Sequence, residues 1–385
     1  MNFELNDEQN QLYDSVQRVL NQHFSFEKRR ELIRAGLWHS PTLMNHLGEL
    51  GVTGLLISTE HGGLGGRLED LWPAIKASAA ALSLEPLWSS AVMATSAVTL
   101  GTARATPAAP LSEPPSELLP RLADGSRLLA WAHDEPGVGT TSGHRTTRAH
   151  RSTQGWTLTG TKSTVLHGPL AHFFVVSAHI ETPSGQSRGP ALFLVDHKEP
   201  SISSRHFRLV DDTAASELTF NATPALALGD PADALGQEET LLQVSLRGMA
   251  ALCVDMLGAM EAAYDMTISY FNLRKQFGRV IGQNQALRHR AAEMRVQLEL
   301  CRSAAVAAVV AADRPEDPHS LREIRQSKLI VGRYARQVCE SAIQCHGGIG
   351  MTEEFAVGHY LRRVHVADHL LGDSKEQAFR LAQWA

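Results

Sequence analysis

The residues with the clearest chemical potential lie in a short stretch, 270–285, that reads YFNLRKQFGRVIGQNQ. This stretch carries a cation, Arg274, and an aromatic ring, Phe277, around a glycine, with amide side chains beyond them. An arginine fork can bind the two negative charges of a dinucleotide pyrophosphate bidentately. The residues alone leave a second interpretation open, in which the stretch is a corner between two helices with a solvated Arg274 and a core Phe277.

A second stretch, 344–350, reads QCHGGIG and follows a helical run. Gly347 and Gly348 have no side chain, so their backbone N–H groups can approach an anionic ligand closely. The alternative is structural, because glycine often ends a helix. The chain has neither GxGxxG after a strand nor GxxxxGK[ST], so neither common phosphate loop is present.

The composition favours a soluble protein of more than one domain. The chain has 385 residues, of which 43% are hydrophobic and 20% charged, which is typical of a soluble protein of two or three domains. The net charge of −5 gives no electrostatic support for nucleic-acid binding. No apolar run approaches membrane-spanning length, and the acidic start MNFELNDEQ lacks the regions of a signal peptide. We therefore expect a cytoplasmic protein without a membrane span.

No metal site is predicted. The four cysteines lack metal-type spacing and fall on predicted helices, so reduced, buried thiols are expected. The histidines show no i, i+4 pair with a carboxylate on a common helix, an arrangement that zinc sites use. The histidines considered were His144, His150, His167, His172 and His179, among others.

The elements that must position these residues fall into three parts. Residues 1–120 predict a helical domain that closes with a proline-rich linker at 106–115. Residues 121–235 contain short aromatic and aliphatic runs between turn residues, which is typical of a small antiparallel β domain. Residues 236–385 predict long helices with short connections and hence an antiparallel bundle.

Local signals predict individual elements. Asn6 with Gln9 forms a capping-box pattern, and Ser40 with Pro41 supplies a cap and a first-turn proline. The expected strands are 128–133, 156–158, 173–177, 191–195 and 218–220. The expected helices include 42–50, 78–84, 91–101, 238–273, 286–312, 321–345 and 355–371, with Asp317 and Pro318 as the cap and first turn before 321.

The two stretches resemble the flavin motifs of the acyl-CoA dehydrogenases, in that family's order and spacing. The first motif consists of Arg274, Gln276, Phe277, Gly278, Ile281 and Gln285, and the second of 344–350 followed by Arg362 and Arg363. The similarity extends from about Leu5 to Leu371. The HGGIGMT…VGHY and KS-x-VLHG segments are most similar to the small subunit of pimeloyl-CoA dehydrogenase, which is a heteromeric type.

The resemblance implies a fold and a reaction. The fold is α+β and multidomain: an N-terminal all-α domain, a middle β domain and a C-terminal helical bundle. The reaction is FAD-dependent removal of the α and β hydrogens of an acyl-CoA in fatty acid metabolism, with an electron-transfer flavoprotein as the electron acceptor. In this family each FAD lies between two subunits, so one chain contributes two separate half-sites.

The resemblance implies that the first half-site binds the pyrophosphate and adenosine end of a neighbour's FAD, and we call it the dinucleotide half-site. By resemblance, Arg274 with Gln276 binds the pyrophosphate, Phe277 packs on the cofactor and Gln285 binds its polar edges. Gln344, Gly347 and Gly348 bring backbone N–H groups to the diphosphate.

The second half-site, which we call the flavin half-site, departs from the family pattern. Where the family has Thr-Glu-Pro, with the threonine bonded to the flavin, this chain has Asp134, Glu135 and Pro136. A carboxylate at Asp134 would oppose the negative charge that flavin reduction develops. The family's Trp-Ile-Thr, which covers the flavin, is replaced by Thr164, Val165 and Leu166.

The general base is also missing from its usual places. Removal of an α-proton needs a positioned carboxylate, and the family has a glutamate at one of two positions. This chain has Leu371 at one and Leu246 at the other. Asp373 is the nearest spare carboxylate, with a helix-terminal loop residue as its alternative interpretation, and Arg247 is a candidate for substrate binding.

These features favour a small subunit of a heterotetramer that lacks a base and completes the FAD site of a larger acyl-CoA dehydrogenase subunit. One alternative is a self-sufficient homo-oligomer with Asp373 as the base. Another is a non-catalytic protein that binds acyl-CoA or only scaffolds a partner. A further alternative is a related flavoenzyme that reacts with oxygen.

Overall fold

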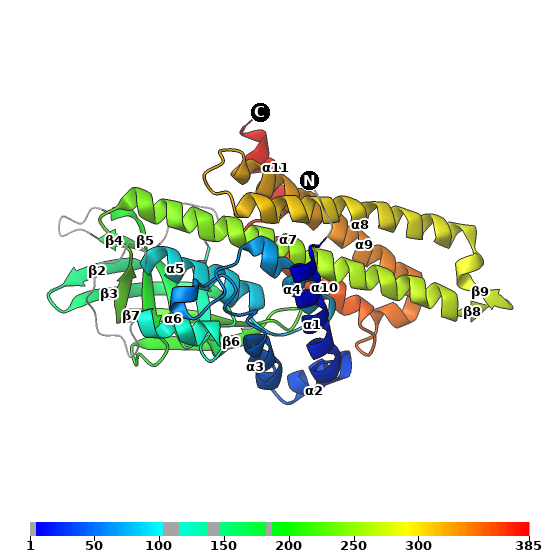
Figure 1. The fold of residues 1–385 in the computed structure, drawn as a ribbon, viewed down its shortest axis with the longest axis horizontal. Helices are drawn as coiled ribbons and strands as arrows, with labels where there is room; N and C mark the ends of the chain where they lie inside the picture. Colours follow the sequence, from blue (N-terminus) through cyan, green and yellow to red (C-terminus); the bar gives the residue numbers. More distant parts are fainter. Residues whose placement is uncertain (1–4, 103–114, 138–145, 182–186, 385) are drawn as a thin grey trace. The chain divides into compact units, whose positions relative to one another are not determined.

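The computed structural model describes residues 5–102, 115–137, 146–181 and 187–384 (Figure 1). The chain forms two compact units, and each is built from separate segments. Unit 1 consists of Met1–Arg34, Leu68–Ser83 and Met249–Ala385. Unit 2 consists of Ala35–Arg67 and Leu84–Gly248. The linker predicted at 106–115 lies outside the described residues except for Pro115, and the division at 120 and 235 stays a prediction.

Unit 2 contains a seven-stranded sheet with the order β1-β4-β2-β3-β7-β5, and β6 pairs with β7. Its strands are β1 (Leu129–Ala132), β2 (Arg148–Ser152), β3 (Gly155–Leu166), β4 (Phe173–Glu181), β5 (Ser187–Asp196), β6 (Ile202–Arg208) and β7 (Ala214–Leu228). The pairs β1–β4 and β2–β4 are parallel, and the others are antiparallel. All five predicted strands are present, whereas β2 and β6 were missed because their residues are mostly polar.

One face of the sheet carries the core of unit 2. Alternation along β1 places Ala130 and Ala132 in a buried cluster with residues of β4 and β5, such as Phe174 and Phe193. Trp131 therefore lies on the opposite face, as does His133, which follows the strand. This alternation fixes which residues near the end of β1 are available to the flavin half-site.

The helices of unit 2 are short. They are α3 (Pro41–Glu49), η1 (Thr59–His61), η2 (Leu87–Ala94), α5 (Thr95–Thr102), α6 (Pro115–Ala123), η3 (Gly168–Leu170) and the first part, up to Gly248, of the long helix α7 (Ala234–Leu273). The Ser40 side chain caps α3 as predicted, by accepting from Leu43 N. The expected helix 91–101 is instead a π-helical turn, η2, that continues into α5.

Unit 1 is a bundle of longer helices. They are α1 (Asp7–His23), α2 (Phe26–Arg34), α4 (Leu68–Ala80), the second part of α7 (Ala234–Leu273), α8 (Gln285–Ala312), α9 (Ser320–His346), α10 (Val357–His369) and α11 (Ser374–Ala382). Figure 1 shows α8 and α9 running alongside each other. Both members of the predicted capping box, Asn6 and Gln9, bond each other's backbone N–H.

Two local predictions in unit 1 were wrong. Residues 78–84 do not begin a helix, because α4 starts at Leu68 and ends at Ala80. Asp317 does not cap α9: the residue before this helix is His319, whose side chain forms no capping bond. Asp317 instead accepts from His319 N, which stabilises the preceding turn.

Candidate functional site

The stretch around Arg274 folds as a small β-hairpin at the end of α7. The hairpin strands are β8 (Lys275–Gln276) and β9 (Arg279–Val280), joined by Phe277 and Gly278. Both turn residues have positive φ, 50° and 78°, which is the geometry of a tight two-residue hairpin turn. An aromatic residue rarely adopts this conformation. The turn leaves the Phe277 side chain fully exposed, at 101%, so the expected alternative of a core Phe277 was wrong.

A small apolar cluster holds the base of this hairpin. Phe271 of α7, Ala291 of α8 and Cys345 of α9 are buried together, with Ile281 packed against them. Ile281 N also donates to Arg274 O at 2.9 Å. Because these residues come from both predicted motifs, the cluster brings the hairpin and the end of α9 to one place in unit 1.

The second motif is a glycine turn that begins where α9 ends. Gly347 has φ 65° and ψ −141°, a region that is essentially restricted to glycine. A Cβ added at Gly347 or Gly348 would meet no atom within 4 Å in the described structure, and both residues are exposed. The turn therefore presents open backbone to a ligand, as binding to a diphosphate requires.

Ring stacking adds a second link between the motifs. The rings of Tyr270 and His346 are stacked with centroids 4.5 Å apart, and the ring of Phe355 also contacts His346, with centroids 5.1 Å apart. Burial lowers the pKa of His346. Its Nδ1 bonds Ala342 O at 2.8 Å, so the ring is held as a neutral donor to the α9 backbone.

The polar residues predicted for the dinucleotide half-site lie at the surface of unit 1. Exposed side chains are found at Arg274, Gln276, Gln285 and Gln344. Arg274 forms no side-chain hydrogen bond or ion pair with any residue that the structure describes, and Gln276 bonds only its neighbour Lys275 O, at 2.7 Å. An exposed guanidinium and an open glycine backbone, on two segments that one apolar cluster joins, fit the anionic part of FAD.

Hydrogen bonds from two residues of β3 hold the backbone of the segment that carries Asp134. Lys162 Nζ donates to His133 O at 3.1 Å, and Ser163 N donates to Asp134 O at 2.9 Å. Lys162 also pairs with Glu135 at 2.7 Å, and both side chains are fully buried. The sequence analysis missed Lys162, whose signal was a lysine in the middle of a strand.

Electrostatics stabilise the Lys162–Glu135 pair. Burial alone would raise the pKa of Glu135, but the charge of Lys162 and hydrogen bonds from Lys162 and Thr146 lower it from 4.5 to about 2. Glu135 accepts from Thr146 N, Thr146 Oγ1 and Thr147 N. The pair therefore stabilises the backbone around Asp134 and leaves no proton for transfer near neutral pH.

The side chains of the flavin half-site do not fit a flavin in the family's manner. Asp134 supplies a carboxylate in place of a hydroxyl, and Thr164 stands where the family has the aromatic residue that covers the flavin. Val165 and Leu166, which follow it, are buried, and Leu166 replaces the hydroxyl at the end of that segment. Trp131 stacks on His133 with centroids 5.3 Å apart and 22° between planes. Its Nε1 is buried and has no hydrogen-bond partner in the described part of the chain.

The two usual positions of the base are leucines held by structural contacts. Leu246 is buried in unit 2, and the adjacent Arg247 donates to Ser96 Oγ at 2.9 Å. Leu371, in unit 1, has a positive φ of 57°. Its carbonyl accepts from Gln377 Nε2 at 3.0 Å, so the backbone at this position is occupied in holding the start of α11.

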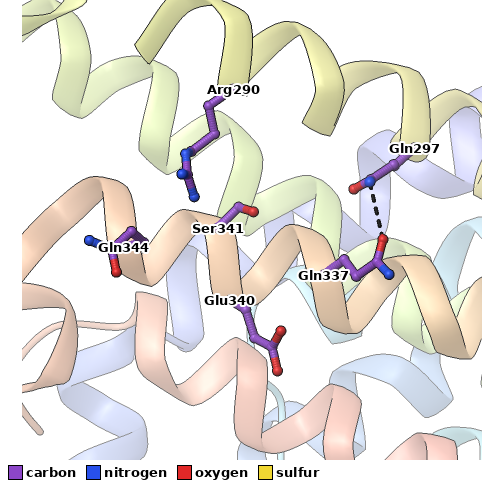
Figure 2. Close-up of a pocket in the computed structure, with 6 residues that line it drawn as sticks. All are labelled: Arg290, Gln297, Gln337, Glu340, Ser341 and Gln344. Atoms are coloured by element: carbon purple, nitrogen blue, oxygen red, sulfur yellow. Dashed lines mark hydrogen bonds between the residues drawn. The ribbon is translucent and has the colours of Figure 1, made fainter. Parts of the chain in front are cut away.

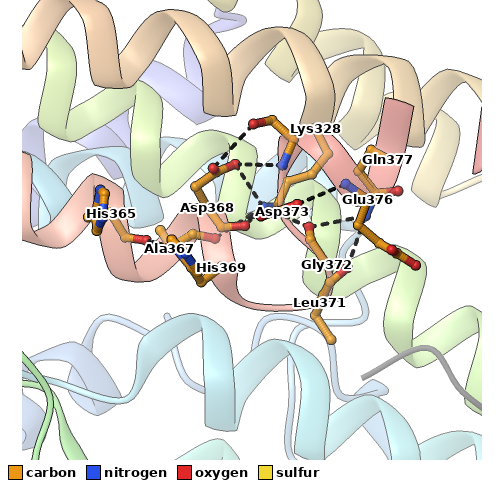
Figure 3. Close-up of polar contacts among 11 residues, drawn as sticks. Lys328, His365, Ala367, Asp368, His369, Leu371, Gly372, Asp373, Glu376 and Gln377 are labelled. Carbon is orange, nitrogen blue, oxygen red and sulfur yellow. Dashed lines mark hydrogen bonds and ion pairs between the residues drawn. The ribbon is translucent and has the colours of Figure 1, made fainter. Parts of the chain in front are cut away.

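Asp373 acts as a helix cap. Its side chain accepts from Glu376 N at 2.8 Å at the start of α11. Figure 3 shows the surrounding network, in which buried Lys328 donates to Asp368 O at 2.7 Å and Ala367 O at 3.1 Å. The structure therefore gives Asp373 a structural role, and its assignment as a base stays a prediction.

One histidine pair escaped the sequence analysis. His365 and His369 lie one turn apart on α10 with ring centroids 5.1 Å apart. His369 Nδ1 bonds His365 O at 2.8 Å. Within the described ranges, no group of three or more histidine, cysteine, aspartate or glutamate residues could hold a metal ion.

The helix α7 is long and apolar enough to cross a membrane by length and composition alone. However, 78% of its most apolar window is buried inside the protein, as in a core helix. The expected absence of a membrane span stays a prediction.

Comparison with known families assigns all three parts of the chain. The acyl-CoA dehydrogenase N-terminal domain matches residues 6–106, the middle domain residues 130–223 and the C-terminal domain residues 246–385. This is the predicted order of helical domain, β domain and helical bundle.

Individual proteins agree with the family comparison. The chain is 31% identical to L-prolyl-[peptidyl-carrier protein] dehydrogenase of Pseudomonas fluorescens over 82% of each chain. A solved structure of a variant of the Tcur3481-Tcur3483 steroid ACAD is 28% identical, with a TM-score of 0.83 over 98% of this chain and 97% of the other. The ChsE4-ChsE5 complex of Mycobacterium tuberculosis shares the fold, at 22% identity and a TM-score of 0.84 over 100% and 98% of the chains.

Proposed function

Because the chain belongs to the acyl-CoA dehydrogenase family, whose members are FAD-dependent oxidoreductases acting on CH–CH bonds, we propose that it is the small, base-lacking subunit of a heterotetramer. In this assembly it completes the FAD site of a larger subunit. FAD accepts a hydride from the acyl thioester in the family's reaction. The role of this chain is to bind the dinucleotide end of the cofactor and to support its partner.

The observation that carries the proposal is the contrast between a dinucleotide half-site that fits FAD and a base position that holds no acid. Arg274 is an exposed cation without a partner among the described residues, and the cluster of Phe271, Ile281 and Cys345 brings its hairpin to the end of α9, where the open backbone of Gly347 and Gly348 begins. A guanidinium there can bind both charges of a pyrophosphate. Such a surface suits a cofactor that a neighbouring subunit holds by its other end.

The catalytic residues support the same proposal. An aliphatic side chain cannot remove a proton, and both usual positions, Leu246 and Leu371, are aliphatic. Asp373 uses its carboxylate to cap α11. The carboxylate that abstracts the α-proton is therefore expected on the partner subunit.

The names of two similar structures favour a heteromer of this kind. The names Tcur3481-Tcur3483 and ChsE4-ChsE5 each pair two components. We propose that the small subunit of pimeloyl-CoA dehydrogenase is the functional counterpart of this chain, with an acyl-CoA as substrate and an electron-transfer flavoprotein as acceptor. The Pseudomonas fluorescens relative, whose name specifies a carrier-protein-bound prolyl group, makes acyl-carrier thioesters the first alternative substrates to test.

The visible absorbance spectrum of the purified chain tests the proposal. Alone, the chain should contain little flavin, and co-purification with a larger acyl-CoA dehydrogenase chain from the same organism should restore it. Arg274→Ala should then weaken the affinity of the assembly for FAD about ten- to one-hundredfold, because a charge-assisted contact is lost. Arg333→Ala, which changes an exposed arginine on α9, is the control.

Two outcomes would contradict the proposal. Full FAD occupancy in the Arg274→Ala assembly would exclude binding of the partner's cofactor by this residue. Stoichiometric FAD in the lone chain, bleached by an acyl-CoA, would instead support a self-sufficient homo-oligomer.

A further inference from the structure

The glycine turn after α9 is open on one side and closely packed on the other. Towards α8, the end of α9 borders an open groove that Arg290 and Gln344 help to line (Figure 2). Towards α10, a Cβ added at Gly358, near the start of that helix, would lie only 3.0 Å from Gly350 O. The contacts that hold the turn in place therefore come largely from the α10 side.

His359 of α10 holds the loop 352–356 that follows the turn. Its Nε2 lies 3.2 Å from Glu353 O, and Arg362 of the same helix donates to Glu353 Oε2 at 2.8 Å. Only 4% of His359 is exposed, and the ring of Phe26 from α2 packs against it edge-on, with centroids 4.8 Å apart. One histidine therefore joins this loop to two helices of unit 1.

Two guanidinium groups face the His359 ring. Arg29 of α2 is only 2% exposed, and its Nη1 lies 3.3 Å from His359 Nδ1. Arg362 Nη2 lies 3.1 Å from Nδ1 and 3.0 Å from Nε2. The Glu353 carboxylate lies 3.5 Å from Nε2. In the described part of the chain, these two arginines and Glu353 are the charged side chains that contact the ring nitrogens.

Only a neutral ring satisfies these donors. A guanidinium has no acceptor, so His359 Nδ1 must accept from Arg29 with its lone pair, and Nε2 then carries the proton that it donates to Glu353 O. A second proton would turn Nδ1 into a donor that faces Arg29. Burial and the charges of the two arginines accordingly lower the pKa of His359, and Glu353 opposes this only in part. Arg30 and Glu354, the next charged residues on α2 and the loop, pair with each other at 3.5 Å.

We infer that neutral His359 is a positioning residue for the glycine turn, and that its protonation releases the loop 352–356 and the turn from α10. The added charge repels Arg29 and Arg362, and Arg362 is also the residue that holds the Glu353 carboxylate. Because the folded protein favours the neutral ring, the contribution of His359 is complete above its ordinary pKa of about 6.5 and is lost as the pH falls below that value.

Two consequences of this inference can be separated. The effect on the turn concerns contacts within this chain alone. The effect on FAD rests on the proposed function, because it requires that the turn binds the dinucleotide end of the cofactor.

Hydrogen exchange of the purified chain at about pH 7.5 and about pH 5, on either side of the ordinary histidine pKa, tests the effect on the turn. After correction for the intrinsic effect of pH, the amides of 347–356 should exchange about ten- to one-hundredfold faster at the lower pH, because a buried group loses its hydrogen bond. His359→Gln keeps an acceptor and a donor but cannot be protonated, so the loop should stay protected at both pH values. His359→Leu removes both bonds, so exchange should be fast at both.

His365→Gln is the matched control, since it removes an exposed histidine from the same helix and should keep the wild-type pH dependence. The inference would be overturned by a pH-independent loop in the wild-type chain, or by an unchanged pH dependence in His359→Gln. Thermal melting checks that each variant folds. If the leucine variant does not fold, the glutamine variant decides alone.

FAD affinity of the assembled protein provides the second measurement. It should weaken about tenfold between the higher and the lower pH in the wild-type assembly and stay constant in His359→Gln. If the loop is released at low pH but Arg274→Ala leaves FAD occupancy complete, His359 positions the turn and the proposed function alone fails.

Discussion

The dinucleotide half-site and the flavin half-site differ in where their charges lie and in what those charges contact. Around Arg274, the polar side chains are exposed and the glycine backbone is open. Around Asp134, the charged groups are buried, and Lys162 and Glu135 are paired at 2.7 Å. The side chains of the dinucleotide half-site are accessible to a ligand. In the flavin half-site, by contrast, the paired charges stabilise the folded backbone.

This contrast separates charged residues that contribute to the fold from charged residues that are free to bind a ligand. Removing one partner of a buried ion pair leaves an uncompensated charge, so Lys162 and Glu135 stabilise the backbone around them only as a pair. Exposed residues such as Arg274 and Phe277 contribute little to stability. A strained Phe277 in the turn therefore indicates a binding role.

The largest effect should come from breaking the buried pair. Lys162→Met leaves the Glu135 carboxylate buried without a counter-charge, so we expect the free energy of unfolding to fall by about 3–5 kcal/mol. Denaturant unfolding measures this value. The double variant Lys162→Met with Glu135→Leu should recover much of the loss, because no charge remains buried.

An exposed pair provides the comparison. Lys28 and Glu31 are 52% and 65% exposed, and Lys28→Met should change the free energy of unfolding by less than about 1 kcal/mol. Equal effects of Lys162→Met and Lys28→Met would contradict the structural role that burial gives the Lys162–Glu135 pair in the flavin half-site.

Lowering the pH should reduce the free energy of unfolding by an amount similar to that expected for Lys162→Met. The folded pKa of Glu135 is lowered from 4.5 to about 2, so its contribution is complete above about pH 4.5 and is lost as the pH falls towards 2. The shift corresponds to about 3 kcal/mol. Denaturant unfolding curves measured across this pH range should show the loss of stability. In Glu135→Gln, the free energy of unfolding should depend less on pH. If the pH dependence is unchanged in that variant, the loss of stability at low pH comes from other carboxylates.

The dinucleotide half-site was more predictable than its surroundings. The resemblance to the family's flavin motifs predicted that Arg274 and Gly347 share a site, and the apolar cluster of Phe271 and Cys345 brings their segments together. The exposure of Phe277 was not predictable, because it depends on two positive φ angles in one turn. Lys162 was missed because its partner Glu135 is 27 residues away and meets it only through the folding of the sheet.

The glycine turn allows strain and ligand contact to be separated. Gly347→Ala should lower the free energy of unfolding by about 1–3 kcal/mol, because φ 65° with ψ −141° is accessible essentially only to glycine. Gly348 lacks this restriction, so Gly348→Ala should stay within about 0.5 kcal/mol of wild type. Its added methyl group should nevertheless reduce FAD occupancy. Thermal melting and flavin absorbance measure the two effects, and full occupancy in Gly348→Ala would place the ligand away from this turn.

The smallest effect concerns Asp373 and decides whether the base is absent from this chain. Asp373→Ala removes the cap of α11 and should cost about 1 kcal/mol of stability. Asp373→Ser keeps a capping oxygen but cannot act as a carboxylate base, so it should retain both stability and the turnover of the assembled protein. Acyl-CoA-dependent flavin bleaching measures turnover. If the serine variant is stable but inactive, Asp373 is the base, and the contrast between a binding half-site and a lost catalytic function no longer holds.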